Sequence, residues 1–380
     1  MTTSGPLVLE RGGLDHLIVL LREDGYEVLG PRVESTAIVH GPIKSTEDLP
    51  VGIEDRQGPG RYRLEQGTDG ALFGYAAPQA SWKAVIHPPE AIVWAGDRTG
   101  AAAPQHASPK QALFAVRPCD MRALEILDLV FLHPDDEIYR ERRKSLFIVA
   151  VNCTSPGGTC FCASMGSGPG APAGFDIALT EVFEGEVIWY LAEAGSNAGD
   201  EVLGRLDGEV AGPSRLSSAR SSVEQATELM GRQLETPGIK ELLYANATNP
   251  RWEETARRCL TCSNCTMVCP TCFCATVEDR QSLDGSYAER VRRWDSCFTL
   301  EFSYVHGGST RTSSAARYRQ WLTHKLGSWQ DQFGLIGCVG CGRCITWCPV
   351  GIDITEEVAA ISAADLRNAE VPLPVPEVTP

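Results

Sequence analysis

The sequence predicts an α+β chain with an N-terminal α/β domain, residues 1–245, an α-helical domain, residues 246–365, and a Pro-rich tail, residues 366–380. Up to about residue 245, apolar runs alternate with helical patterns. From about residue 246, helical patterns dominate and cysteines accumulate. The final stretch, EVPLPVPEVTP, cannot be helical because its prolines lack the backbone N–H that a helix uses.

Two apolar runs and the segment between them define the N-terminal part. ALFAVRP (112–118) and SLFIVAVN (145–152) have few polar interruptions and read as buried strands. Between them, DMRALEILDLVFL (120–132) carries apolar residues at helical spacing. A strand–helix–strand order of this length indicates a βαβ unit in a parallel sheet.

Three helices are expected in the second part. NPRWEETARR (249–258) leads into the first cysteine motif, and SSAARYRQWLTHKLGSW (313–329) precedes the second. DITEEVAAISAADLRNA (353–369) follows the second motif, with Asp353 and Glu356 spaced as a capping box.

Composition and charge exclude several classes of partner. The 380 residues are 43% hydrophobic, which is enough for a core and for two domains or more. A formal charge of −15 argues against a nucleic-acid partner, which would need clustered Lys and Arg. The N-terminus lacks a basic n-region, and the apolar run Leu17–Leu21 is too short for a signal core or a membrane span. We therefore expect a cytoplasmic protein without nucleic-acid or membrane partners.

Cysteine spacing is the strongest chemical signal. Of fifteen cysteines, eleven lie from Cys259 to Cys348, and eight of these form two runs of the form C-x2-C-x2-C-x3-C-P. This is the bacterial ferredoxin spacing, in which the fourth cysteine of each run ligates the other cluster. The predicted ligands are Cys259, Cys262, Cys265 and Cys348 for one [4Fe-4S] cluster, and Cys338, Cys341, Cys344 and Cys269 for another.

A pair of zinc sites is the alternative reading of these cysteines, and it predicts a colourless protein. Zinc usually takes two CxxC pairs, whereas each run here has four cysteines followed by proline. The 68 residues between Cys269 and Cys338 exceed what a minimal ferredoxin needs. We therefore favour an α-helical ferredoxin-like domain with two [4Fe-4S] clusters.

Four further cysteines form an N-terminal set. Cys119 follows one predicted strand and Cys153 the next, and Cys160 and Cys162 come soon after in a loop of small residues. Adjacent parallel strands would place the first two side by side at the carboxyl edge of the sheet, where ligands collect. We favour a third [4Fe-4S] cluster there over the alternative of buried cysteines acting as small hydrophobes.

Three cysteines have no place in these sets. Cys272, Cys274 and Cys297 lack an obvious fourth thiol, so we expect them to contact or shield a cluster rather than to ligate one. Outside the cysteine motifs, the sequence contains no convincing dinucleotide, Walker or nucleophile-elbow motif.

Four segments together resemble a known family. They are VRPCDMRALEILDLVF, NCTSPGGTCFCASMGSGPGAPAGFDIALTE, RRCLTCSNCTMVCPTCFC and GCVGCGRCITWCPVGIDIT. The family is that of the iron–sulfur β subunit of soluble, NAD(P)-linked [NiFe] hydrogenases, the sulfhydrogenases, and anaerobic sulfite reductases contain a member of the same family. The resemblance covers about residues 110–360 and does not extend to the first hundred.

The resemblance implies an electron-transfer subunit without a catalytic site of its own. Its partners would be a diaphorase subunit that binds flavin and NAD(P), together with the small and large [NiFe] hydrogenase subunits. The alternatives are the equivalent subunit of an anaerobic sulfite reductase, or a cluster-based thiol/disulfide reductase that uses Cys272, Cys274 or Cys297. Arg257, Arg258 and Arg343, within or beside the motifs, are candidates to raise the reduction potential of a neighbouring cluster.

Overall fold

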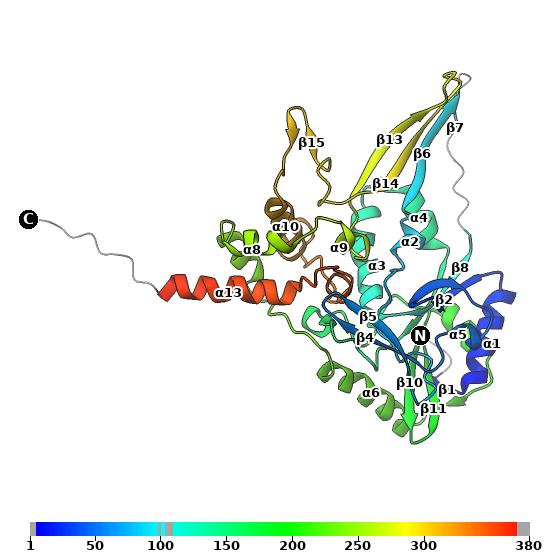
Figure 1. The fold of residues 1–380 in the computed structure, drawn as a ribbon. Helices are drawn as coiled ribbons and strands as arrows, with labels where there is room; N and C mark the ends of the chain where they lie inside the picture. Colours follow the sequence, from blue (N-terminus) through cyan, green and yellow to red (C-terminus); the bar gives the residue numbers. More distant parts are fainter. Residues whose placement is uncertain (1–4, 98–99, 103–108, 371–380) are drawn as a thin grey trace, which may run out of the picture.

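The computed structural model describes residues 5–97, 100–102 and 109–370 and shows a mixed α/β protein (Figure 1). Its largest sheet has eight strands in the order β12-β1-β11-β10-β9-β8-β2-β3. Their bounds are β1 Leu7–Leu9, β2 Glu27–Glu34, β3 Ala37–Pro42, β8 Gln111–Val116, β9 Leu146–Val151, β10 Ile177–Glu184, β11 Val187–Ala194 and β12 Glu209–Val210. The central strands β2, β8, β9 and β10 are parallel, and the outer pairs are antiparallel.

The structure contains the predicted βαβ unit. β8 and β9 pair in parallel, and α3, Pro118–Phe131, connects them together with α4, Glu137–Lys144. α3 begins directly after β8 because Pro118 suits the first turn of a helix, where its missing N–H is not needed. This short connection places the N-terminus of α3 at the carboxyl edge of the sheet.

Further helices cover the large sheet. α1, Arg11–Glu23, buries Leu14, Leu17, Ile18 and Leu21, an i, i+3, i+4, i+7 stripe, in the main apolar core. The remaining helices of this part are α2 Lys83–Ile86, α5 Asn197–Leu203, α6 Pro213–Glu228 and α7 Ile239–Ala245. A separate hairpin joins β4, Ile53–Gly58, to β5, Arg61–Gln66.

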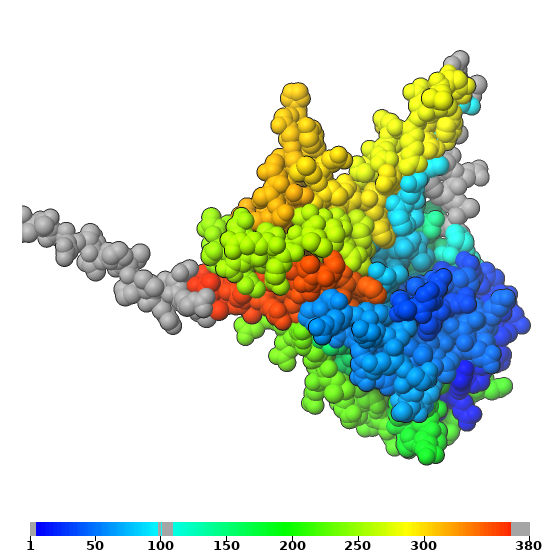
Figure 2. Space-filling view, viewed as in Figure 1, coloured from blue at the N-terminus to red at the C-terminus, as the bar shows by residue number. Residues whose placement is uncertain are grey.

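A second sheet joins segments that are far apart in the sequence. It has the order β13-β14-β6-β7, with β6 Glu90–Asp97, β7 Gly100–Ala102, β13 Ala275–Gln281 and β14 Tyr287–Trp294. Figure 2 shows it as an arm that projects from the body, beside a second arm formed by β15, Tyr304–Val305, and β16, Gly308–Ser309. The sequence did not predict this sheet, which pairs the N-terminal part with the region between the cysteine motifs.

The three helices expected around the cysteine motifs are present. α8 spans Arg251–Arg258, and the helix expected at 313–329 is α10, Ser314–Thr323, followed by a π-helical turn, His324–Ser328, and α11, Trp329–Phe333. α13 spans Ile354–Glu370. Most of the predicted Pro-rich tail, residues 371–380, lies outside the described residues.

Short helices complete this part of the chain. They are α9, Asn264–Met267, and α12, Arg343–Thr346, each of which follows the second cysteine of a motif. The apolar side chains of this region form their own buried cluster, which includes Trp252, Phe298 and Trp321. Among the described residues, no helix is both long and apolar enough to cross a membrane.

Candidate iron–sulfur sites

The two cysteine motifs adopt the same backbone conformation. Thr261 and Ser263 in the first motif have φ of 48° and 67°, and Gly340 and Gly342 at the equivalent positions have 63° and 73°. In both motifs the N–H two residues after the first cysteine donates to its Sγ, at 3.4 Å for Cys259 and 3.5 Å for Cys338. Left-handed residues turn the chain tightly enough to direct successive thiols to one side, which explains the fixed spacing.

The first ligand set predicted from the sequence surrounds one cavity. This cavity is lined by Cys259, Cys262, Cys265 and Cys348, and also by Cys344. Three of these thiols belong to the first motif and Cys348 is the last cysteine of the second. Cys348 also accepts a hydrogen bond at 3.3 Å from the backbone N–H of Ile352.

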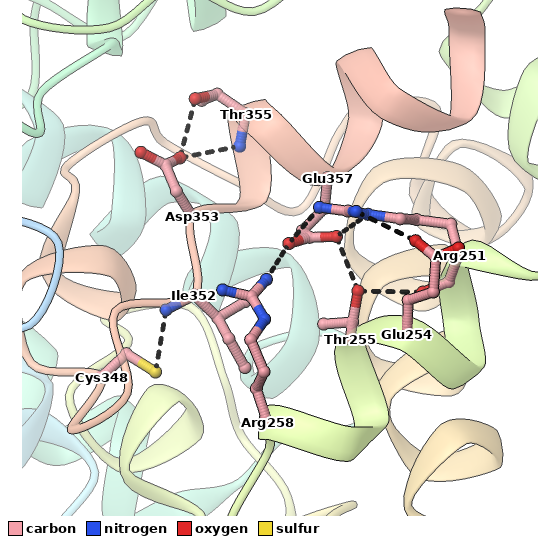
Figure 3. A network of polar contacts seen from close by, with 9 residues as sticks. All are labelled: Arg251, Glu254, Thr255, Arg258, Cys348, Ile352, Asp353, Thr355 and Glu357. Atoms are coloured by element: carbon pink, nitrogen blue, oxygen red, sulfur yellow. Dashed lines mark hydrogen bonds and ion pairs between the residues drawn. The ribbon is translucent and has the colours of Figure 1, made fainter. Parts of the chain in front are cut away.

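Polar contacts between two helices link the motifs that line this cavity, and Figure 3 shows these contacts. α8 ends immediately before the first motif, and α13 begins shortly after the second. The buried Glu357 of α13 accepts hydrogen bonds from Arg251, Thr255 and Arg258 of α8, at 2.6 to 3.1 Å. At the start of α13, Asp353 caps the helix by accepting from the N–H of Thr355 at 3.0 Å. The carboxylate of Glu357 therefore fixes the distance between the two motifs.

The second predicted set, Cys338, Cys341, Cys344 and Cys269, lies in a more enclosed place. These thiols are close enough to perturb one another's titration, and burial raises the pKa of Cys338 to about 12. Cys269 differs, because a hydrogen bond from Cys272 and the nearby Lys325 ammonium lower its pKa. Buried thiols become thiolates only when a cation compensates their charge, and iron supplies that compensation when it binds.

The N-terminal set surrounds a second cavity. Its walls include Cys119, Cys153, Cys160 and Cys162, and also Cys341 of the second motif. Cys119 lies in the first turn of α3 rather than in a loop. Burial raises the pKa of all four thiols. Across the described ranges, no three His, Cys, Asp or Glu side chains converge as they would around a single metal ion.

The second motif packs directly on the loop of the N-terminal set. The N–H of Phe161 donates to the carbonyl of Gly340 at 2.8 Å, and Ser167 Oγ donates to the carbonyl of Val339 at 2.6 Å. A Cβ on Gly342 would lie 2.4 Å from the carbonyl oxygen of Thr159. The first motif tolerates serine at the equivalent position, so this close approach, and not the backbone angle alone, accounts for glycine here.

A buried ion pair completes the same interface. Arg343 is 1% exposed and contacts both carboxylate oxygens of Asp120, at 2.9 and 2.7 Å. Its Nε also donates to the carbonyl of Pro78 at 2.6 Å. Of the other arginines singled out in the sequence, Arg258 pairs with Glu357 and Arg257 is exposed.

The remaining cysteines line neither cavity. The thiol of Cys274 is hydrogen-bonded to that of Cys297, which lowers the pKa of Cys274 to about 7 and raises that of Cys297. Cys272 is hydrogen-bonded to Cys269. All three are free thiols, as are the other twelve.

Two buried lysines beside these thiols were not anticipated from the sequence. Lys325, in the π-helical turn, is 4% exposed, and Lys83 is 3% exposed. Lys83 Nζ donates to the carbonyl of Cys272 at 3.0 Å and lies 3.9 Å from the centre of the Trp294 ring. A signal for Lys325 was present, because it falls between Leu322 and Leu326 on the apolar side of the predicted helix.

Comparison with known proteins identifies the region that holds these motifs. Residues 258–352 match the family model of a 4Fe-4S dicluster domain. The chain is 36% identical over 248 residues to sulfhydrogenase 2 subunit beta of Pyrococcus furiosus, an alignment that covers 64% of this chain and 72% of the relative. No solved structure gives a significant match.

Proposed function

Because the chain belongs to the family of the sulfhydrogenase β subunits, we propose that it passes single electrons from a diaphorase subunit, which binds flavin and NAD(P), to a [NiFe] hydrogenase catalytic module, or in the reverse direction. The dicluster domain supports iron–sulfur electron transfer. The observation that carries the proposal is the cavity around which cysteines from both motifs gather. When bound, the clusters supply one-electron redox chemistry.

We assign the three cysteine sets to three [4Fe-4S] clusters. Site 1 consists of Cys259, Cys262, Cys265 and Cys348, site 2 of Cys338, Cys341, Cys344 and Cys269, and site 3 of Cys119, Cys153, Cys160 and Cys162. The donors fit such clusters, because each set offers four thiols from converging segments and no carboxylate. The proposed domains are residues 1–245, with site 3, and an α-helical ferredoxin-like domain at 246–365, with sites 1 and 2.

The cavity walls give the proposed order of the three sites. Cys344 of site 2 also lines the cavity of site 1, and Cys341 of site 2 also lines the cavity of site 3. Site 2 therefore lies between the other two. This order supports a linear relay whose two ends face different partners.

Iron and acid-labile sulfide per chain, measured with EPR of the reduced protein, test the assignment. We expect about twelve irons per chain, from three clusters of four irons each. About eight irons would remove site 3 from the proposal, and a colourless protein that contains zinc would contradict it as a whole.

Cys341→Ser tests the relay itself. The variant removes one ligand from the middle site, so we expect loss of electron flow between pyridine nucleotide and the catalytic module in the assembled complex. Cys274→Ser is the matched control, since Cys274 lies outside all three proposed sets, and it should keep wild-type flow. Full turnover by Cys341→Ser would contradict the relay.

A further inference from the structure

The buried Lys325 presents an electrostatic problem. An ammonium group removed from water is costly unless an anion or several hydrogen-bond acceptors compensate it. Lys325 Nζ donates to Cys269 Sγ at 3.1 Å, to Thr271 Oγ1 at 2.9 Å and to the carbonyl of Gly337 at 3.2 Å. Within the described part of the chain it forms no ion pair with a carboxylate. Among the described residues, the groups that can compensate its charge as anions are therefore the neighbouring thiols in their ionised form.

The helix that contains Lys325 is irregular at this residue, and the irregular turn positions the side chain beside Cys269. The regular helix α10 is interrupted by the π-helical turn His324–Ser328 before it continues as α11. Such turns are rare and are frequently found at functional sites. The N–H of Gly337, just before the second motif, donates to the carbonyl of Lys325 at 2.9 Å. Backbone and side chain of this lysine thus both bind the site 2 region.

Arg343, at the same site, differs from Lys325 in how its charge is neutralised. Its guanidinium is also buried, but both oxygens of Asp120 neutralise it. The pair as a whole contributes little net charge. No carboxylate among the described residues neutralises Lys325, which lies 3.1 Å from Cys269 Sγ and binds the carbonyl of Gly337, next to Cys338. Both of these cysteines belong to proposed site 2.

We propose that Lys325 raises the reduction potential of the cluster at site 2 above those of its neighbours, which makes the middle of the relay its electron reservoir. A cluster with thiolate ligands gains negative charge on reduction, so a nearby cation and an N–H donor to its sulfur stabilise the reduced form. This inference rests on the proposed function and adds a positioning residue to it. Lys325 acts through Cys269 and is not itself a ligand.

The test is a redox titration followed by EPR on the full chain purified with its clusters. In Lys325→Met, one cluster should titrate at a potential lower by at least about 59 mV, a tenfold change in its one-electron equilibrium. Lys325→Arg keeps the charge and should restore most of the shift. Lys325→Gln removes the charge but keeps a hydrogen-bond donor, so it carries the test if the methionine variant does not retain iron.

Lys240→Met is the matched control. Lys240 lies on the neighbouring α7, pairs with the carboxylate of Asp331 and does not contact a cysteine. The Lys240→Met variant should leave the reduction potentials of all clusters unchanged. Unaltered potentials in an iron-replete neutral Lys325 variant would overturn the inference, as would an equal shift of every cluster. A third outcome would also overturn the inference: both neutral variants lose the site 2 cluster while Lys325→Arg retains it. The positive charge would then be needed to bind the cluster rather than to set its reduction potential. Absence of [4Fe-4S] signals from the wild-type protein would instead overturn the proposed function as well.

Discussion

At the scale of single residues, the neighbourhood of β6 contains a histidine that is held neutral by its surroundings. His87 is fully buried, and its ring nitrogens have no hydrogen-bond partner within the described residues. Burial, and then the charges of Arg292 and Lys83, lower its pKa to about 3, while Asp136 opposes them. The ring packs 4.6 Å from Phe131. His87 therefore behaves as an apolar side chain at neutral pH.

This burial predicts a pH dependence of stability. The pKa of His87 rises from about 3 in the folded chain to about 6.5 on unfolding, so acid protonates the unfolded state first. The contribution of the neutral His87 to the free energy of unfolding is complete above pH 6.5. It declines by up to about 1.4 kcal/mol per pH unit as the pH falls towards 3. His87→Phe should show a smaller loss of thermal stability between about pH 7 and 5 than the wild type. The exposed His133→Phe is the control. Equal acid sensitivity of His87→Phe and wild type would contradict this account.

At the scale of elements, the close approach of the two cysteine loops makes Gly342 a sensitive position. Gly342→Ala would push a Cβ against the backbone oxygen of Thr159, and backbone atoms cannot rotate away. We expect a loss of at least about 2 kcal/mol of stability, from steric strain at a positive φ. The measurement is the thermal midpoint under anaerobic conditions, with iron content in parallel. Ser263→Gly, at the equivalent position of the first motif, should be tolerated, and a wild-type midpoint for Gly342→Ala would contradict the expected clash.

Some helices and strands of this protein could be predicted from the sequence and others could not. The βαβ unit and the three helices around the cysteine motifs were predictable because their apolar spacing is local. The sheet β13-β14-β6-β7 was not, because ATVEDRQ and YAERVRRW are mostly polar and their partner β6 lies far earlier in the chain. The π-helical turn that carries Lys325 has no signature in the sequence either.

The candidate cluster sites were also only partly predictable from the sequence. The grouping of the motif cysteines stays a prediction from their spacing, and the cavity lined by Cys259, Cys262, Cys265 and Cys348 agrees with its first set. The contribution of Cys341 to the N-terminal cavity could not be predicted from the sequence, because it depends on how the two parts of the chain pack. Lysine in an amphipathic helix is usually solvated, so the position of Lys325 on the apolar side of its helix was not read as burial.

At the scale of the whole molecule, the two parts of the chain depend on each other. β14 pairs along its length with β6, and Arg343 requires Asp120 as its counterion. We therefore expect that residues 246–380 expressed alone hold less iron per chain and have a lower thermal midpoint than the full chain. Without residues 1–245, Arg343 loses both of its partners, Asp120 and the carbonyl of Pro78. Co-expression with residues 1–245 is the control and should restore both quantities. Full iron content in the isolated fragment would contradict this dependence.

Because Cys341 lines the cavity of the N-terminal cysteine set, this cavity cannot be complete until Cys341 has been synthesised. Synthesis proceeds from the N-terminus, so the ribosome completes Cys119, Cys153, Cys160 and Cys162 long before Cys341 exists. Until the second motif emerges and docks, the N-terminal pocket lacks one of its sides and stays open to solvent. Closure of that pocket by Cys341 therefore has to follow synthesis of the second motif.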